Sequence, residues 1–129
     1  MPIVKVYRRQ GRPAEENRQI LAGIHEALVA AFKIPDDDRN HLLFELDAAH
    51  LELPADRTAA YTLIEIAAFP GRSVDAKRAL YAGIVERLGM LGVPASDVFV
   101  VLAEPPLECW SVRNGLASCD ARPSFKLNV

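Results

Sequence analysis

The sequence predicts an α+β fold of two β-α-β units, whose four strands form one sheet with both helices on the same face. Three observations predict this fold. Strand-like and helix-like segments alternate along the chain, the second half repeats the first at an offset of about 60 residues, and half of the residues are hydrophobic. A chain of 129 residues with this composition is expected to form a single domain over residues 1–129.

The first unit covers residues 2–46. Residues 2–7 alternate in polarity, which is typical of a half-buried strand. A Gly-Arg-Pro break separates this strand from a helix over residues 14–32, and a second strand follows at 42–46. The apolar residues of the helix recur near helical spacing at Ile20, Ile24, Leu28 and Phe32.

The second unit covers residues 61–103. It begins with a strand over 61–68, and Ser73 then suits the N-cap of a helix over 74–91. Residues 98–102 form a nearly unbroken apolar run, which predicts a central buried strand.

The two units share identical residues in the same order: Gly11 and Gly71, Arg12 and Arg72, Arg18 and Arg78, Ala22–Ile24 and Ala82–Ile84, Asp38 and Asp97. Each unit is expected to join two parallel strands by a right-handed crossover. Helices on one face leave the other face of the sheet bare. Because that face is apolar, we expect further copies of the chain to cover it in a closed homo-oligomer.

The segments outside the units have weaker patterns. Residues 47–60 are expected to form a loop or a short hairpin, and residues 104–129 form a tail. In the tail, residues 124–129 alternate like an edge strand that would pair with a neighbouring subunit. Cys109 and Cys119 are expected to be free thiols.

Composition and charge exclude several classes of protein. The net charge is -2, so the sequence carries no nucleic-acid footprint. No apolar run reaches the ~20 residues that span a bilayer, and the amino-terminal segment lacks a signal-peptide core. We therefore expect a cytoplasmic protein. No metal site is expected, because the histidines are too scattered to form a ligand set: His25, His41 and His50.

Five segments together carry a family resemblance: Met1–Lys5, Ile34–Arg39, Phe69–Ser73, Ala76–Arg78 and Glu104–Trp110. In this order and at this length they resemble the tautomerase superfamily, and most of all its malonate semialdehyde decarboxylase group, over essentially the whole chain. The resemblance implies a homotrimer of β-α-β repeats, an active site around an amino-terminal proline, and no metal or organic cofactor. It also implies a small oxo-acid substrate whose carboxylate is held by arginines.

Pro2 is the expected catalytic residue. Its nitrogen has a basic lone pair only after Met1 is removed. An α-amino group titrates just above neutrality, and nearby cations lower that pKa. With a lowered pKa the amine is a general base near pH 7, whereas a protonated amine would polarise a carbonyl as an acid. The sequence leaves both roles open, beside a third reading in which Pro2 only permits the removal of Met1.

Arg72 is the expected carboxylate-binding residue, because a guanidinium contacts a planar carboxylate through two hydrogen bonds. A cation beside a helix N-terminus opposes the helix dipole, which makes this a poor place for a merely structural arginine. The alternative is a solvated turn residue. Arg12 has the same place in the first unit, and pseudo-symmetry predicts that it lies near a related site.

Three further residues complete the predicted site. Asp38 matches an aspartate that the decarboxylase group uses near its proline, which implies a hydrogen bond to Pro2 or a water held for hydration; a solvated turn residue is the alternative. Arg39 would pair with Asp38 or with substrate. Trp110 would form an apolar wall over the substrate or anchor a subunit interface.

One departure from the decarboxylase pattern affects the predicted reaction. The resemblance implies an Arg-Pro-Arg turn before the second helix, but this sequence has Pro70-Gly71-Arg72 there, with one arginine. We therefore rank a proline-dependent keto–enol tautomerase acting on a small 2-oxo acid above a decarboxylase or hydratase of a small 3-oxo acid such as malonate semialdehyde. The alternative from another class is a non-catalytic trimeric binding protein on the same scaffold.

Overall fold

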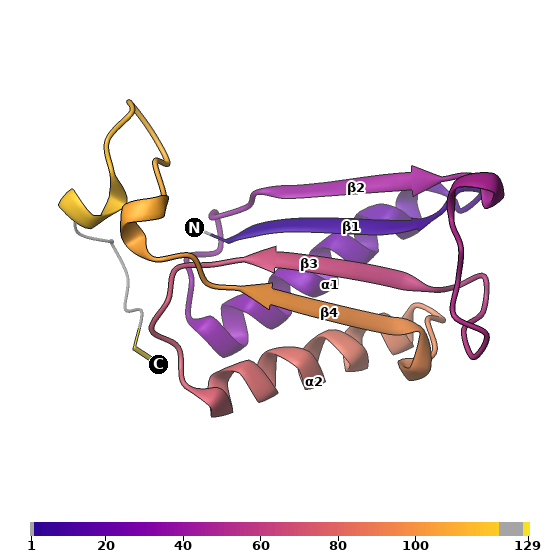
Figure 1. Ribbon diagram of the computed structural model, residues 1–129. Coiled ribbons are helices and arrows are strands. Elements are labelled where there is room, and N and C mark those ends of the chain that lie inside the picture. The colour runs from indigo at the N-terminus through magenta and orange to yellow at the C-terminus, as the bar shows by residue number, and fades with distance from the viewer. Residues whose placement is uncertain (1, 122–127) are drawn as a thin grey trace.

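The computed structural model describes residues 2–121 and 128–129, and it has one four-stranded sheet with both long helices packed on the same face (Figure 1). The first unit consists of β1 (Ile3–Arg9), α1 (Ala14–Phe32) and β2 (His41–Leu46). The second unit consists of β3 (Thr62–Ala67), α2 (Val74–Met90) and β4 (Val98–Ala103). The predicted α+β fold of duplicated β-α-β units is confirmed.

The sheet has the strand order β2-β1-β3-β4. The prediction of a central buried strand over 98–102 is wrong, because β4 is an edge strand whose residues alternate between partly buried and exposed. Its unbroken apolar run supplies both the core side and the bare outer face of the sheet. Strands within a unit pair in parallel, and the two units meet through the antiparallel pair of β1 and β3. The amino-terminal ends of β1 and β2 therefore share one end of the sheet with the carboxyl ends of β3 and β4 (Figure 1). Loops from both units meet at that end.

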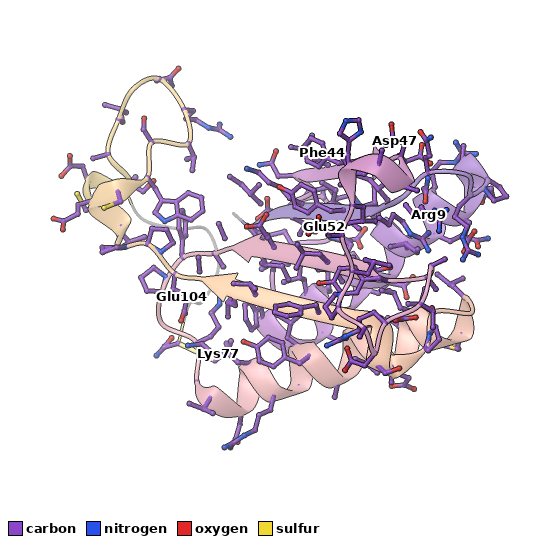
Figure 2. The ribbon with its side chains drawn as sticks, turned by 45° about the vertical axis from the view of Figure 1, so that its right-hand side comes forward. Arg9, Phe44, Asp47, Glu52, Lys77 and Glu104 are labelled. Atoms are coloured by element: carbon purple, nitrogen blue, oxygen red, sulfur yellow. The ribbon has the colours of Figure 1, made fainter. Side chains whose placement is uncertain are left out.

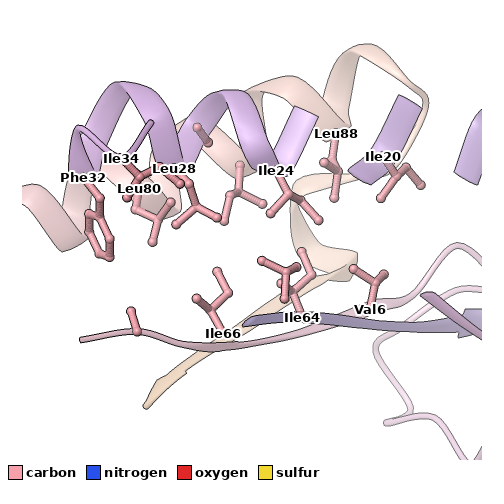
Figure 3. Packing of buried hydrophobic residues seen from close by; sticks show 14 of the residues in the cluster. Val6, Ile20, Ile24, Leu28, Phe32, Ile34, Ile64, Ile66, Leu80 and Leu88 are labelled. Carbon is pink, nitrogen blue, oxygen red and sulfur yellow. The ribbon is translucent and has the colours of Figure 1, made fainter. Parts of the chain in front are cut away.

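The hydrophobic core lies between the helices and the inner face of the sheet (Figure 3). The predicted helical spacing of α1 is confirmed, because its four apolar positions are all buried: Ile20, Ile24, Leu28 and Phe32. Three residues of α2 complete the helical side of the core: Leu80, Ile84 and Leu88. The sheet contributes the inward-facing residues of its central strands, which are Val4, Val6, Ile64 and Ile66.

β1 extends beyond its predicted end at residue 7, because Arg8 continues the buried side of the strand. The Nη1 atom of Arg8 donates to the Oδ1 atom of Asn17 at 3.1 Å, and Nη2 lies 3.8 Å from Glu16 Oε1. These partners, from the first turn of α1, allow a charged side chain to occupy a core position.

The outer face of the sheet carries exposed apolar side chains on both edge strands, as expected of a face that another copy covers. Its most exposed apolar residues lie on β2 and β4: Leu42, Phe44, Phe99 and Val101. The ring of Phe44 also stacks on Tyr7 of β1, with the ring centroids 5.0 Å apart.

Residues 47–60 form a loop rather than a hairpin, with one short 3-10 turn at Ala48–His50. Asp97, just before β4, holds this loop, because its carboxylate accepts hydrogen bonds from the amide and the hydroxyl of Thr58. The edge strand predicted over 124–129 falls outside the described residues, apart from Asn128 and Val129. Free thiols were predicted for the two cysteines, and both are free: Cys109 and Cys119.

Candidate active site

Pro2 lies at the end of the sheet where loops from both units meet. It is buried, and it directly precedes β1. The amide of Val4 donates to the carbonyl of Asn40 at 2.8 Å, so the segment leading into β2 runs beside the start of β1. On the other side of β1, Ile3 pairs with Ala67, the last residue of β3. Pro2 therefore lies between the segment before β2 and the segment after β3.

Arg72 comes from the turn after β3, where Gly71 has a φ of 125° that favours glycine. The side chain is buried, with 6% of the residue exposed. Its Nη1 atom donates to the main-chain carbonyl of Phe69 at 2.9 Å, and its guanidinium lies 4.9 Å from the centre of the Phe32 ring. The structure thus rules against a solvated turn residue at this position.

Burial lowers the pKa of the Arg72 guanidinium from its ordinary value, and the nearby carboxylates of Glu104 and Asp38 oppose that change. A guanidinium remains protonated in proteins even so. Arg72 is therefore a fixed positive charge in a largely desolvated position, with two carboxylates in range. Such a charge can hold a small carboxylate in a defined orientation.

Asp38 is half-buried in the loop between α1 and β2. Its amide donates to the carbonyl of Pro35 at 3.1 Å, which closes a tight turn. The charge of its carboxylate acts on Arg72 and on His41, so Asp38 faces the interior of this end of the sheet. Arg39, in contrast, is exposed and pairs with Asp36, whose Oδ1 atom lies 3.9 Å from its Nη2 atom.

Glu104 and Lys77 form a second charged pair close to Arg72. Glu104 directly follows β4, and Lys77 belongs to the first turns of α2. Lys77 Nζ and Glu104 Oε1 are 2.5 Å apart, and both side chains are largely buried (Figure 2). The pair joins the carboxyl end of β4 to the helix that begins after Arg72.

Trp110 packs within its own chain. Its ring meets the Phe69 ring edge to face with the centroids 5.0 Å apart, and its Nε1 atom donates to the carbonyl of Pro105 at 3.0 Å. The carbonyl of Phe69 also accepts a hydrogen bond from Arg72. The packing of Trp110 on Phe69 therefore supports the position of the arginine side chain.

Arg12 lies away from this cluster. It follows β1, so it occupies the opposite end of the sheet from Pro2. Its side chain is 40% exposed, and its Nη1 atom lies 3.8 Å from Glu16 Oε1. Within one chain, the structure brings Pro2, Asp38 and Arg72 to the same end of the sheet and leaves Arg12 at the other.

Two histidines lie behind the Asp38 loop. His25 of α1 is fully buried, and its Nε2 atom is 2.7 Å from the carbonyl oxygen of Asp36. The His41 ring lies next to it, with the centroids 5.3 Å apart. Burial, together with His25 and Arg39, lowers the pKa of His41 to about 4, although the charge of Asp38 acts in the opposite direction. His41 is therefore neutral at pH 7.

Residues 2–121 and 128–129 contain no group of three or more His, Cys, Asp or Glu side chains that could hold a metal ion. No helix in this part of the chain is long and apolar enough to cross a membrane.

Two protein-family models match this chain over the residues just described. A family model described as "Tautomerase enzyme" matches residues 38–113, and a second model of that description matches residues 2–56. The chain belongs to the tautomerase family. The two matches together cover Pro2, Asp38, Arg72, Glu104 and Trp110.

Relatives of this tautomerase-family enzyme agree with that assignment. The Bacillus subtilis protein YusQ, named as a probable tautomerase, is 29% identical over 91% of this chain and 97% of its own length. The crystal structure of a malonate semialdehyde decarboxylase is similar with a TM-score of 0.83 at 26% identity, covering 93% of this chain and 99% of that chain. An asymmetric trimer of a fused 4-OT is similar with a TM-score of 0.82 at 25% identity, covering 92% and 97%.

Sequence reasoning did not assign four polar residues at this end of the tautomerase: Lys77, Glu104, His25 and His41. Glu104 had a usable signal, since it is a carboxylate directly after the apolar run of β4, at the carboxyl end of a parallel pair. The histidines were considered only as metal ligands. His25 lies two helical turns before Phe32 on the buried side of α1, and this spacing was the available signal for its position.

Proposed function

We propose that this tautomerase-family enzyme is a proline-dependent keto–enol tautomerase that acts on a small 2-oxo acid. The observation that carries the proposal is the buried guanidinium of Arg72, held by Phe69 and Phe32 at the end of the sheet where Pro2 and Asp38 also lie. A desolvated cation next to an amino-terminal amine suits a substrate that carries a carboxylate beside the reacting carbons.

In the proposed reaction Arg72 binds the substrate carboxylate through two hydrogen bonds and so places the enol beside Pro2. The Pro2 nitrogen, as a free secondary amine, accepts the proton of the enol hydroxyl and delivers a proton to carbon 3. The C2–O bond becomes a carbonyl as the carbon–carbon double bond becomes single. One proton leaves the substrate and one returns, so the reaction needs no other reactant.

Three further residues have supporting roles in the proposal. The Asp38 carboxylate hydrogen-bonds the proline nitrogen or a water beside it, and it partly balances the charge of Arg72. Trp110 keeps water from the guanidinium side by packing on Phe69. Arg39 is exposed at the rim and would meet the substrate only as it enters.

We also propose that the enzyme assembles as a homotrimer through the bare face of the sheet. The exposed apolar residues of β2 and β4 support this assembly. Fused 4-OT trimers are similar at 25% and 27% identity, with TM-scores of 0.82 and 0.81, which supports the same arrangement here. Sedimentation at several protein concentrations tests it, because a monomer at all of them would contradict the trimer.

A second candidate activity is decarboxylation or hydration of a small 3-oxo acid such as malonate semialdehyde. It is favoured by the similarity to two malonate semialdehyde decarboxylases, at 26% and 28% identity. The same Arg72 and Asp38 would serve, with the enolate forming as carbon dioxide leaves. The single arginine of the Pro70-Gly71-Arg72 turn places this activity second.

The first experiment measures the ultraviolet rate of phenylenolpyruvate ketonisation by protein whose intact mass confirms the loss of Met1. We expect a rate well above buffer, and a rate close to buffer for Pro2→Ala. Equal rates for the two proteins would contradict the role of the proline nitrogen. If neither protein exceeds buffer, acetaldehyde and carbon dioxide release from malonate semialdehyde decides between the second activity and the non-catalytic binding protein.

A further inference from the structure

We propose that His25 is a positioning residue that sets the place of Asp38 in the active site. The inference rests on the proposed function, because it concerns how the Asp38 carboxylate is presented to Pro2. The hydrogen bond of His25 goes to the main chain of Asp36, not to the reacting residues of the proposed site. Its effect would pass through the main chain of the loop that carries Asp38.

The proposed anchor is a hydrogen bond between the long helix α1 and this loop. His25 is fully buried on α1, and its Nε2 atom lies 2.7 Å from the main-chain oxygen of Asp36, two residues before Asp38. A carbonyl oxygen only accepts, so Nε2 carries the proton and donates it. Short-range bonds within the loop run from Asp38 to Pro35 and from Arg39 to Asp37, and the Val4 amide of β1 holds the loop at Asn40, after Asp38. The bond from His25 holds it at Asp36, before Asp38.

The side chain of Asp36 does not provide an equivalent anchor. Its carboxylate is exposed, with an oxygen 3.5 Å from His25 Nε2 and 3.9 Å from Arg39 Nη2. Arg39 is itself exposed, and its Nε atom lies 3.4 Å from the same Asp36 carbonyl. Contacts of this kind at the surface restrain a loop weakly, whereas a short bond from a fully buried donor restrains it strongly.

The same side of α1 also supports the other charged residue of the site. Phe32 lies seven residues after His25, which places both on one side of the helix two turns apart. The Phe32 ring lies against the Arg72 guanidinium at 4.9 Å. One buried side of α1 therefore contacts Arg72 through the Phe32 ring and holds the Asp38 loop through the hydrogen bond of His25. The distance between these two charges depends on a rigid helix rather than on the loops themselves.

The test compares two substitutions of His25 in the ketonisation assay. His25→Gln keeps a donor close to the place of Nε2, and His25→Leu removes the donor while filling the space. We expect His25→Leu to lower kcat by about 10- to 100-fold with little change in KM, because a displacement of about 1 Å can cost that much. His25→Gln should recover most of the loss.

A control variant and a double-mutant cycle separate positioning from general destabilisation. Ile84→Ala removes a fully buried side chain from α2, away from the loop, and should lower stability without lowering kcat. In an Asp38→Asn background His25→Leu should add no further loss, because both changes act on one carboxylate. Amide exchange at Asp38 should accelerate in His25→Leu and not in His25→Gln.

Three results would overturn the inference while leaving the proposed function in place. They are a kcat of His25→Leu equal to that of Ile84→Ala, full additivity of His25→Leu with Asp38→Asn, and unchanged amide exchange in the loop. Absence of Pro2-dependent ketonisation in the wild-type protein would instead overturn the proposed function, and the inference would fall with it.

Discussion

The molecule has two Gly-Arg turns with the same local sequence and different surroundings. Gly11 and Gly71 both have a positive φ, at 110° and 125°, and each is followed by an arginine before a helix. Arg12 is exposed and pairs with Glu16, while Arg72 is buried against Phe32. The repeat thus contains two matched turns, and only the turn at Gly71 lies at the same end of the sheet as Pro2.

The difference between the turns comes from residues far from them in sequence. Glu16 provides a local partner for Arg12, whereas the matched position in the second unit is Ala76, whose methyl group cannot pair with a guanidinium. Arg72 instead contacts the last residue of α1, Phe32, and the carbonyl of Phe69. Identical turn chemistry therefore leads to a surface ion pair in one unit and to a desolvated cation in the other.

The matched aspartates differ in the same way. Asp97 is fully buried and accepts two hydrogen bonds from Thr58, so it has a structural partner for each carboxylate oxygen. Asp38 is half-buried, and its charge acts on Arg72 at the Pro2 end of the sheet. One end of the sheet thus holds a buried aspartate that ties down a loop, and the other holds Asp38 and Arg72, the charged residues of the proposed site.

Removing each arginine gives the largest expected contrast. Arg72→Leu should lower kcat/KM for phenylenolpyruvate about 100-fold or more, because truncating one partner of a desolvated charge interaction costs about 2–5 kcal/mol. Arg12→Leu should change kcat/KM by less than about 2-fold and unfolding by less than about 1 kcal/mol, as for a surface ion pair. Equal losses in both variants would show that the two turns are functionally equivalent.

Substituting the two aspartates should have opposite effects: Asp97→Ala should lower mainly stability, and Asp38→Ala should lower mainly activity. Asp97→Ala removes a fully buried carboxylate that accepts two hydrogen bonds from Thr58. Because hydrogen bonds to a charged group contribute about 1–3 kcal/mol, we expect a loss of that size in unfolding free energy and a normal turnover rate. Asp38→Ala should lower kcat about 100-fold with a smaller effect on stability. Urea unfolding and ketonisation of both variants measure the contrast. An Asp97→Ala protein as stable as the wild type would contradict the stabilising role of Asp97.

Much of the fold could be predicted from the sequence, because periodicity and repetition are local properties. The spacing of Ile20, Ile24, Leu28 and Phe32 defines α1 without knowledge of its partners, and the repeat defines the topology. The end of β1 was predicted too early, because a charged residue such as Arg8 does not indicate a buried strand position. In the structure its partners on α1 allow it to be buried.

The candidate site was predictable only where a motif named its residues. Pro2, Asp38 and Arg72 came from the family resemblance, and the structure brings them to one end of the sheet. The unequal fates of Arg12 and Arg72 could not be predicted, because the two turns read alike and differ in tertiary contacts. His25 and His41 were missed because spacing along the chain does not reveal that their rings lie 5.3 Å apart.

A pH series tests a further difference between the units. His41 pairs with Val4 in the first unit, and Val100 occupies the same register position beside Ile64 in the second. Because the pKa of His41 falls from 6.5 to about 4 on folding, the unfolded chain binds the proton more tightly. The contribution of this residue to stability is therefore complete above pH 6.5 and is lost as the pH falls towards 4.

We expect the wild-type protein to lose about 1–2 kcal/mol of unfolding free energy through His41 between pH 7 and pH 5. His41→Val gives the first unit the residue of the second and should remove that part of the pH dependence. Urea unfolding at both pH values, at one protein concentration, measures the difference. An unchanged pH dependence in the variant would mean that other groups cause it.

Phe32→Leu gives the smallest expected effect and tests what holds Arg72 in place. The matched position at the end of α2 is Leu91, so the variant makes the two helix ends alike. The guanidinium would lose its aromatic partner, worth about 0.5–1 kcal/mol or more when desolvated, but would keep the bond to the Phe69 carbonyl. We expect KM to rise about 3-fold while kcat stays nearly constant, because the arginine binds the substrate carboxylate in the ground state and the transition state alike. A fall in kcat with unchanged KM would mean that the Phe32 ring affects the reacting atoms, through the same stripe of α1 that carries His25, rather than the binding of the carboxylate.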